Sequence, residues 1–328
     1  MTFSRADYSK STNADDVAQF LHDEIVGKTV VITGVSPSNL GSEFAYAIST
    51  HSPKLIVIAG RNVEKLEEVV KTINSKAPDV PVRYVQLDLS SLEAAKKAGQ
   101  EVAGWEDVEI IDTLVNNAGI MATPYKKTVD GFESQFAVNH LAHYVWTAQV
   151  FPKILASAAQ GRSPRIVNVS SNGHKVHDIN WESLDFNDGK NYDMWDAYGQ
   201  SKTANVLFSV GLAEKFGGKG VYSYSLHPGM CGETHLGLHI PMDDIYEFLA
   251  SGKAPEPGID VSMKTLQQCS STHVVAAFDP ELKPHNGLYL ADCQIGDVTR
   301  RKDYAVNKDS AKKLWEITEQ LTGVKFQE

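Results

Sequence analysis

The stretch KTVVITGVSPSNLG, residues 28–41, carries the strongest indication of fold in this chain. Residues 28–33 form a short apolar, β-branched run that predicts a buried strand, and residues 40–50 have the apolar spacing of a helix. A glycine-containing turn at 34–41 joins them. This order brings backbone N–H groups and a helix N-terminus together, which suits a bound pyrophosphate. With only two glycines, the turn would serve equally well as a plain connection.

The same order of strand, turn and helix continues outward along the chain. Most of the expected strands are apolar runs rather than strict alternations, as in sheets that are covered on both faces. The pattern predicts an α/β fold, a doubly wound, mostly parallel sheet of about seven strands with helices on both faces. The further expected strands are 54–59, 82–87, 109–115, 165–169, 221–226 and 287–290, and the further helices are 63–76, 91–103, 131–156 and 197–216.

Three segments exceed this repeat: residues 1–27, 172–197 and 230–275. We interpret them as surface elaborations of one domain spanning 1–328: an N-terminal extension with a short helix near 15–25, and two insertions that form a small substrate-binding lobe. Apolar side chains in the insertions could line a substrate pocket, although packing of a surface lobe explains them nearly as well. They are Met230, Met242, Tyr246, Phe248, Trp181, Phe186, Tyr192 and Trp195.

Composition narrows the class of partner and the compartment. The chain is 42% hydrophobic with a net charge of -10, which argues against nucleic acid or an anionic membrane as a partner. Cys231, Cys269 and Cys293 form no CxxC pattern, so reduced thiols are expected. No apolar run is long enough to span a bilayer and the first 16 residues are polar, so we expect a cytoplasmic protein without membrane insertion.

Residues that suit a nucleotide follow the expected strands, where parallel sheets bind ligands. Arg61 follows the second strand and would pair with a 2′-phosphate on an adenosine ribose, unless it is a solvated helix-start residue. Asp88 follows the third strand and would contact adenine or cap the next helix. Asn116-Asn117-Ala118-Gly119 follows the fourth: amide side chains can cross-link loops there, and Gly119 admits a ligand.

Tyr198 and Lys202 are four residues apart, which places both on one helix face. A tyrosine pKa of about 10 is too high for acid–base work near neutrality, and a nearby ammonium favours the phenolate. The pair occurs by chance in many helices, so alone it indicates a solvated face. Asn139, in an otherwise apolar helix, needs a partner or water, and Ser171 ends the fifth strand.

Taken in this order, the residues resemble the short-chain dehydrogenase/reductase family over about residues 28–230. The length and the gap between Ser171 and Tyr198 are similar to retinol-dehydrogenase and WW-domain-oxidoreductase-like members, which have fungal relatives in secondary metabolism. The resemblance implies a Rossmann-type oxidoreductase. It would transfer a hydride between NADP(H), or alternatively NAD(H), and an alcohol or ketone on a fairly bulky, mostly apolar molecule. Homodimers are common in the family.

The resemblance also implies roles. Tyr198 would donate a proton in reduction or accept one in oxidation, and Lys202 would lower its pKa and bind the nicotinamide ribose. Ser171 would hold the substrate oxygen, and Asn139 a water that relays protons to Lys202. The implied cofactor-binding residues are Gly34, Ser36, Asn39, Leu40, Gly41, Arg61, Asp88, Leu89, Asn117, Ala118, Gly119, Tyr198, Lys202, Pro228, Gly229 and Thr234.

The chain departs from the family pattern in two places. The glycine turn lacks a third glycine and is one residue longer, with Ser38 or Asn39 in its place; asparagine tolerates positive φ better than most residues. The threonine expected after Pro228-Gly229 is displaced to Thr234, which leaves its cofactor contact in doubt.

Other functions are weighed on the same residues. The pairs His140/His143 and His174/His177 have a metal-like spacing, but no acidic or thiol cluster accompanies them, so no metal is expected. A non-catalytic nucleotide-binding or interaction protein on this fold is one alternative. A relative that catalyses a non-redox isomerisation or cyclisation is another.

Overall fold

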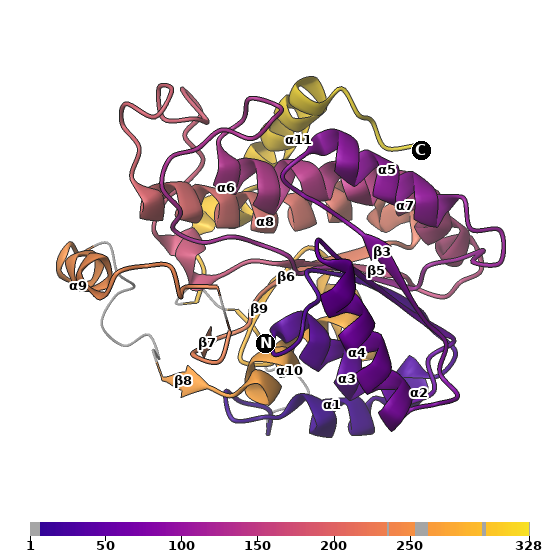
Figure 1. Ribbon diagram of the computed structural model, residues 1–328. Helices are drawn as coiled ribbons and strands as arrows, with labels where there is room; N and C mark the ends of the chain where they lie inside the picture. Colours follow the sequence, from indigo (N-terminus) through magenta and orange to yellow (C-terminus); the bar gives the residue numbers. More distant parts are fainter. Residues whose placement is uncertain (1–6, 235, 253–261, 297–299, 328) are drawn as a thin grey trace.

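The structure, a computed structural model, describes residues 7–234, 236–252, 262–296 and 300–327. Within these residues, an eight-stranded sheet of order β10-β9-β6-β5-β4-β1-β2-β3 forms the centre (Figure 1). Its strands from β3 to β9 are parallel, and β10 pairs antiparallel with β9. The predicted doubly wound, mostly parallel sheet is therefore confirmed, and the short edge strand β10 was not expected. The strands are β1 (Thr29–Thr33), β2 (Leu55–Gly60), β3 (Val82–Gln86), β4 (Thr113–Asn116), β5 (Arg165–Val169), β6 (Tyr222–His227), β9 (Tyr289–Ala291) and β10 (Gln294–Ile295).

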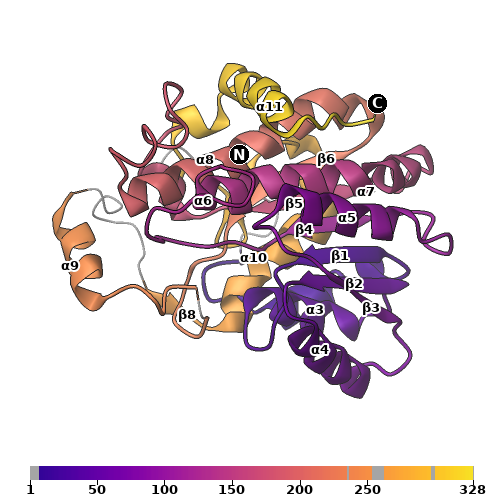
Figure 2. The ribbon, with the colours of Figure 1, turned by 45° about the horizontal axis from the view of Figure 1, so that its top comes forward.

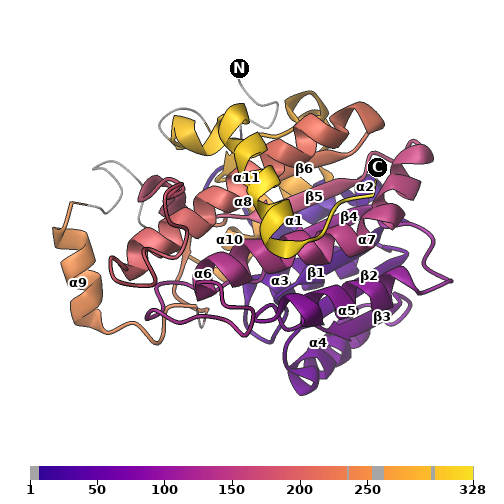
Figure 3. The ribbon, with the colours of Figure 1, turned by 90° about the horizontal axis from the view of Figure 1, so that it is seen from above.

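Helices cover both faces of the sheet (Figures 1 and 2). One layer holds α1, α2, α3, α4 and α10, and the other holds α5, α6, α7, α8 and α11, which lie across the sheet in Figure 3. The helices are α1 (Ala14–Phe20), α2 (His22–Ile25), α3 (Leu40–Ser49), α4 (Val63–Lys76), α5 (Leu92–Ala103), α6 (Ser134–Phe136), α7 (Ala142–Ala159), α8 (Met194–Phe216), α9 (Met242–Ala250), α10 (Leu266–Phe278) and α11 (Lys308–Thr322).

Burial explains the strand composition. Every residue of β1, β2 and β5 is buried, which fits their mostly apolar sequences, and one large apolar cluster packs on each face of the sheet. The edge strand β3 differs, because most of its residues are partly or fully exposed. Its sequence VRYVQ accordingly mixes polar and apolar residues.

Two segments expected at the surface belong to the core. Ala14, Val17 and Ile25 of the N-terminal extension are fully buried, and α1 packs against α10 and α3. Helix α10, placed by the sequence in a surface lobe, is buried from Cys269 to Phe278. Its small polar residues are buried with partners, as when Ser270 Oγ donates to the Leu40 carbonyl (3.3 Å).

The helix expected at 131–156 begins later and is interrupted. Glu133 caps α6 by accepting hydrogen bonds from Gln135 N and Phe136 N, both at 2.7 Å. A π-helical turn, Ala137–Leu141, then precedes α7. Such turns add one residue per turn and turn side chains away from their regular positions, often at functional sites.

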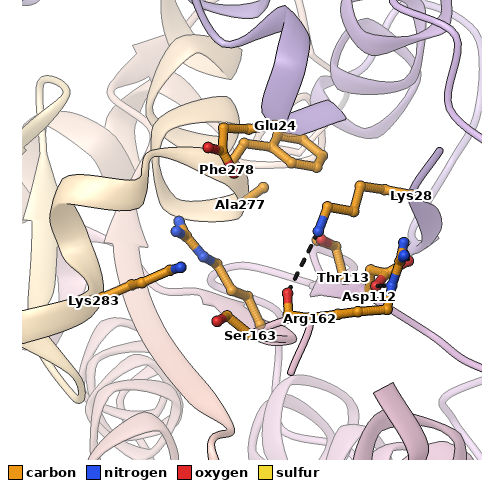
Figure 4. Close-up of a pocket in the computed structure, with 10 residues that line it drawn as sticks. Glu24, Lys28, Asp112, Thr113, Arg162, Ser163, Ala277, Phe278 and Lys283 are labelled. Carbon is orange, nitrogen blue, oxygen red and sulfur yellow. Dashed lines mark hydrogen bonds and ion pairs between the residues drawn. The ribbon is translucent and has the colours of Figure 1, made fainter. Parts of the chain in front are cut away.

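A small polar pocket lies at the amino-terminal edge of the sheet, opposite the strand ends that suggested function (Figure 4). Its chemistry is structural. Asp112 accepts hydrogen bonds from Thr29 N (2.9 Å), Ser157 Oγ (2.9 Å) and Arg162 Nε (2.6 Å). Arg165 donates to the carbonyls of Ala276 (3.1 Å) and Asp279 (2.7 Å), near the C-terminus of α10, where a cation is favoured.

Asp112→Ala should therefore destabilise the protein by about 3 kcal/mol, because it leaves a guanidinium and two donors without their acceptor. The free energy of unfolding in urea measures the change. Asp107→Ala, which removes an exposed partner of Arg83, serves as the control and should cost less than about 1 kcal/mol. A loss below about 1 kcal/mol for Asp112→Ala would contradict this account of the pocket.

Candidate active site

The turn after β1 and the turn after β4 lie in backbone contact at the carboxyl end of the sheet. Gly34 has φ +72°, and a Cβ on it would lie 2.5 Å from Ala118 Cα. Asn117 Nδ2 donates to the carbonyls of Thr33 (2.9 Å) and Gly34 (3.2 Å). The chain turns from one half of the sheet to the other between these strands, which is where dinucleotides bind in such folds.

Asn39 organises the turn between β1 and α3. Its Oδ1 accepts from Ser42 N (2.9 Å), and its Nδ2 donates to the Gly34 carbonyl (2.8 Å) and to Ser36 Oγ (2.9 Å). Ser38 takes the left-handed conformation with φ 57°, whereas Asn39 is extended at φ -137°. Ser38 therefore takes the left-handed position at which the family pattern has a glycine, and Asn39 is the N-cap of α3. A Cβ on Gly41 would lie 2.9 Å from the Gly34 carbonyl oxygen, so a side chain does not fit where the start of α3 packs against this turn.

Tyr198 and Lys202 are buried side by side on α8. Lys202 Nζ lies 5.7 Å from the centre of the Tyr198 ring and donates to the Val169 carbonyl (3.1 Å). A Cβ on Gly173 would lie 2.6 Å from Tyr198 Cε1, so a glycine there lets the ring pack on the backbone after β5. Ser171 is hydrogen-bonded to the tyrosine. The structure therefore brings Ser171, Tyr198 and Lys202 together.

Burial dominates the electrostatics of this pair. It raises the pKa of Tyr198 to about 12, against a smaller lowering by the hydrogen bond with Ser171, and it lowers the pKa of Lys202 to about 7. From the sequence we expected the Lys202 ammonium to lower the pKa of Tyr198, whereas in the structure this pKa is raised. Desolvation decides the direction for both groups, because each charged form is disfavoured when its surroundings lose water. At neutral pH the tyrosine is protonated.

Asn139 stands in the π-helical turn, facing the same site. A Cβ on Gly119 would lie 3.2 Å from Asn139 Oδ1 and 3.3 Å from Lys202 Nζ. The Asn139 side chain accepts from Ile120 N (2.9 Å) and donates to the Ile120 carbonyl (2.9 Å) and to Ser201 Oγ (2.8 Å). It thereby ties the segment after β4 to α8. Its expected part in holding a water stays a prediction.

The remaining candidates are less closely gathered. Arg61 is exposed after β2, and its guanidinium has no hydrogen-bond or ionic partner in the described part of the chain. Asp88 accepts from Ser90 N (2.9 Å), while Ser91 caps α5, so neither Asp88 nor Ser90 is the cap. Leu89 beside it is buried.

After β6, Lys264 covers the turn at Pro228-Gly229. A Cβ on Gly229 would lie 2.5 Å from Lys264 Cδ, and Lys264 Nζ is paired with Asp292. Among the described residues, the Thr234 hydroxyl donates to the Cys231 carbonyl, at 3.5 Å, which links it to none of the other candidate cofactor residues. Its expected cofactor contact stays a prediction.

A lobe made of β7 (Met230–Cys231), β8 (Met263–Lys264) and α9 lies at one side of the body, with α9 near the start of α8 (Figure 1). Phe248 of α9 stacks on Trp195, three residues before Tyr198, with ring centres 4.3 Å apart. His239 Nε2 lies 3.2 Å from the Ala122 carbonyl oxygen, beyond β4. The lobe thus contacts both sides of the site.

The other expected pocket residues differ. Phe186 is buried against Tyr192, Trp181 packs near α11 under Lys313, and Met230 and Tyr246 are largely exposed. The side chain of Met242 lies outside the described residues.

The histidine pairs with metal-like spacing have other partners, since His140 lies 2.8 Å from Thr318 Oγ1 and His174 2.6 Å from the Ser171 carbonyl oxygen. In the part of the chain that is described, no cluster of three or more metal-binding side chains is found.

Sequence reasoning overlooked Thr33, Ser201 and Asn205, whose side chains hold the site together. Thr33 is a hydroxyl that ends an otherwise apolar strand, and that departure is the signal that could have revealed it. Ser201 and Asn205 carried no such signal.

Comparison with known proteins settles the family. Residues 28–183 match the family model described as short chain dehydrogenase. The mouse protein retinol dehydrogenase 12 is 32% identical over 304 residues, 93% of this chain and 89% of that protein. This chain belongs to the short-chain dehydrogenase/reductase family. The oxidoreductase calI of Penicillium decumbens is a further relative of this short-chain dehydrogenase/reductase, 31% identical over 90% of this chain and 87% of its own.

Solved structures agree with this assignment. A protein of Mycobacterium paratuberculosis matches with a TM-score of 0.69 and 26% identity over 100% of both chains. A Beutenbergia cavernae protein, named as an NAD(P)-dependent gluconate 5-dehydrogenase and carrying NADP, matches with a TM-score of 0.62 and 25% identity over 82% of this chain and 96% of its own. Family membership makes this chain a dehydrogenase/reductase of the CH–OH/C=O type with a nicotinamide cofactor. None of the described helices is both long and apolar enough to cross a membrane.

Lys202→Met should stabilise the fold, because a buried ammonium near pKa 7 costs folding free energy when the unfolded lysine titrates near 10.5. The native state binds fewer protons than the unfolded state between these values, so wild-type stability rises with pH across this window. The gain from Lys202→Met should therefore be largest near pH 7 and shrink toward pH 10. Urea unfolding at several pH values measures it, with the exposed Lys71→Met as control; an equal gain at pH 7 and pH 10 would contradict the prediction.

Proposed function

We propose that this short-chain dehydrogenase/reductase is an NADP(H)-dependent reductase of ketones or aldehydes, with Tyr198 as the proton donor. The observation that carries the proposal is the buried, protonated Tyr198, hydrogen-bonded to Ser171 and flanked by Lys202 at the carboxyl end of β5. A neutral phenol next to a second hydroxyl suits a carbonyl oxygen, which can accept from both.

The turn after β1 and the residue after β2 favour a dinucleotide as the cofactor. The turn at Gly34 and Gly41 leaves no room for a Cβ, and this keeps the backbone N–H groups and the start of α3 accessible to a pyrophosphate. Arg61 offers a cation without a partner where a 2′-phosphate on the adenosine ribose would lie. A protein with the same fold and 25% identity carries NADP.

The direction of proton transfer follows from burial. When bound, the nicotinamide supplies the hydride. Ser171 and Tyr198 would hold the carbonyl oxygen, and Tyr198 would give it a proton as charge develops. The Lys202 ammonium would stabilise the phenolate left behind and return a proton to it, and a pKa near 7 lets Lys202 regain that proton at neutral pH. Burial keeps Tyr198 protonated at neutral pH, which is the form that reduction requires.

We further propose a fairly bulky, mostly apolar substrate. Retinol dehydrogenases of mouse and human are among the relatives, at 32–34% identity. The lobe beside the site exposes several large apolar side chains: Leu238 is 72% exposed, Met263 62% and Tyr246 61%. A substrate held by such groups would be selected by shape and apolar area.

Tyr198→Phe should lower the rate of NADPH-dependent reduction at least about 100-fold, since it removes the proton donor and keeps the ring that packs on Gly173. A panel of carbonyl compounds that includes retinaldehyde and small ketones, followed by NADPH absorbance, measures it. Tyr192→Phe, on a tyrosine that hydrogen-bonds the Thr123 carbonyl, is the control and should retain most activity. Full activity of Tyr198→Phe would overturn the mechanism, and turnover without a change in oxidation state would overturn the reaction class.

Arg61→Ala should raise the KM for NADPH at least about tenfold and leave that for NADH nearly unchanged, because an exposed charge-assisted pair to a phosphate is lost. Steady-state kinetics with both cofactors decides this. Lys71→Ala, also exposed and on the following helix α4, controls for a general loss of positive charge. Equal losses for the two cofactors would show that Arg61 does not recognise the phosphate.

A further inference from the structure

His143 joins the nucleotide turn to the catalytic turn through one chain of hydrogen bonds. Its Nε2 lies 3.0 Å from Thr33 Oγ1, at the end of β1, and its Nδ1 lies 3.1 Å from the Asn139 carbonyl oxygen, in the π-helical turn. The side chain is 1% exposed, and both ring nitrogens are bonded. In contrast, Nδ1 of the neighbouring buried His140 has no hydrogen-bond partner among the described residues.

The partners of Thr33 determine which way the protons point. A hydroxyl group donates once and accepts twice. Thr33 Oγ1 already accepts from Asn117 N (3.0 Å) and Ala118 N (3.1 Å), the backbone of the turn after β4. Its own proton must therefore go to His143 Nε2, which leaves the ring proton on Nδ1, donated to the Asn139 carbonyl. This carbonyl also accepts from Asn205 Nδ2 (2.7 Å), on α8.

The network excludes a charged imidazolium, which would carry protons on both nitrogens and meet the Thr33 hydroxyl proton head-on. The net effect of the groups that face the ring agrees with this. Burial is the largest effect and, against the Asn139 carbonyl, which raises the pKa of His143, and together with the Lys202 ammonium, which lowers it, brings this pKa to about 4. The neutral state with one defined proton position therefore holds throughout the physiological range.

We propose that His143 is a positioning residue that couples cofactor binding to the catalytic turn, with Nε2 fixing the Thr33 clamp on Asn117 and Ala118 and with Nδ1–H fixing the Asn139 carbonyl. The proposal rests on the proposed function of the same site. It adds that one buried side chain serves both halves of the site through different atoms. Substitutions at His143 should therefore affect cofactor binding and hydride transfer separately.

Two amide variants test the two ring nitrogens of His143 separately. In His143→Gln the amide oxygen can replace Nε2 as acceptor for Thr33, but the donor to Asn139 is lost. In His143→Asn the amide nitrogen can replace Nδ1 as donor to Asn139, but the acceptor for Thr33 is lost. His143→Leu removes both, and Thr33→Val removes the clamp while keeping the shape of Thr33, which Thr33→Ser should restore.

NADPH affinity is measured by calorimetry, and the hydride-transfer rate at saturating NADPH by stopped flow with the best carbonyl substrate of the panel. His143→Asn and Thr33→Val should weaken NADPH binding at least about tenfold, with transfer within about threefold of wild type. His143→Gln should slow hydride transfer and leave NADPH binding nearly unchanged, and His143→Leu should impair both. His140→Leu, buried on the same segment and bonded to α11, is the control: it should lower the unfolding midpoint without changing NADPH affinity.

Histidine-specific ¹⁵N spectra give a readout independent of turnover: Nδ1 of His143 should be protonated and Nε2 bare from pH 6 to 8. The opposite tautomer, or unchanged affinity and transfer in His143→Leu, would overturn the proposal. Equal loss of both quantities in the Asn and Gln variants would show a merely structural role and would also overturn it. If no carbonyl compound is reduced, the proposed function fails, while affinity and spectra still decide the role of His143.

Discussion

The close approach of two backbone turns, at Gly34 and Ala118, is the constraint on which the rest of this structure depends. A side chain on Gly34 would collide with Ala118 Cα at 2.5 Å. The contact requires β1 and β4 to keep one register, in which Ile32 pairs with Val115. Hydrogen bonds secure both ends of this strand pair: Asp112 binds Thr29 N at the start, and Asn117 binds the Thr33 carbonyl at the end. A nucleotide cradle needs such precision, because its donors are backbone groups that cannot adjust.

Tyr198 and Lys202, on the other side of this contact, also need to be held in fixed positions. Tyr198 and Lys202 are almost completely buried, and burial shifts each pKa against its charged form. The energetic cost of a buried lysine falls on the fold, so activity and stability oppose one another at this site. The surrounding polar groups are bonded to one another across elements distant in sequence, as when Asn139 joins Ile120 to Ser201. Such a network keeps the pair in place.

The predictions from sequence succeeded where a local pattern has one physical meaning. Apolar runs such as residues 29–33 became buried strands, and the spacing of Tyr198 and Lys202 placed them on one helix face. They failed where burial depends on neighbours distant in the chain. Residues 230–275 exceed the strand–helix repeat and were expected at the surface, yet Ser270 is buried against α3. The direction of the pKa shift of Tyr198 was likewise missed, because desolvation depends on packing that no spacing reveals.

The amino-acid sequence was sufficient to predict the alternation of strands and helices, the parallel sheet and most of the residues at its carboxyl edge, because strand period, helix period and turn chemistry are local properties. Packing alone assigned the special turn conformation to Ser38 instead of Asn39, since φ at a turn is set by the hydrogen bonds that Asn39 makes with Gly34 and Ser42. Packing also gave Thr33 and His143 their place between the two halves of the site. Hydrogen bonds between residues as much as 110 positions apart follow from how the layers pack, and a linear pattern contains no record of that geometry.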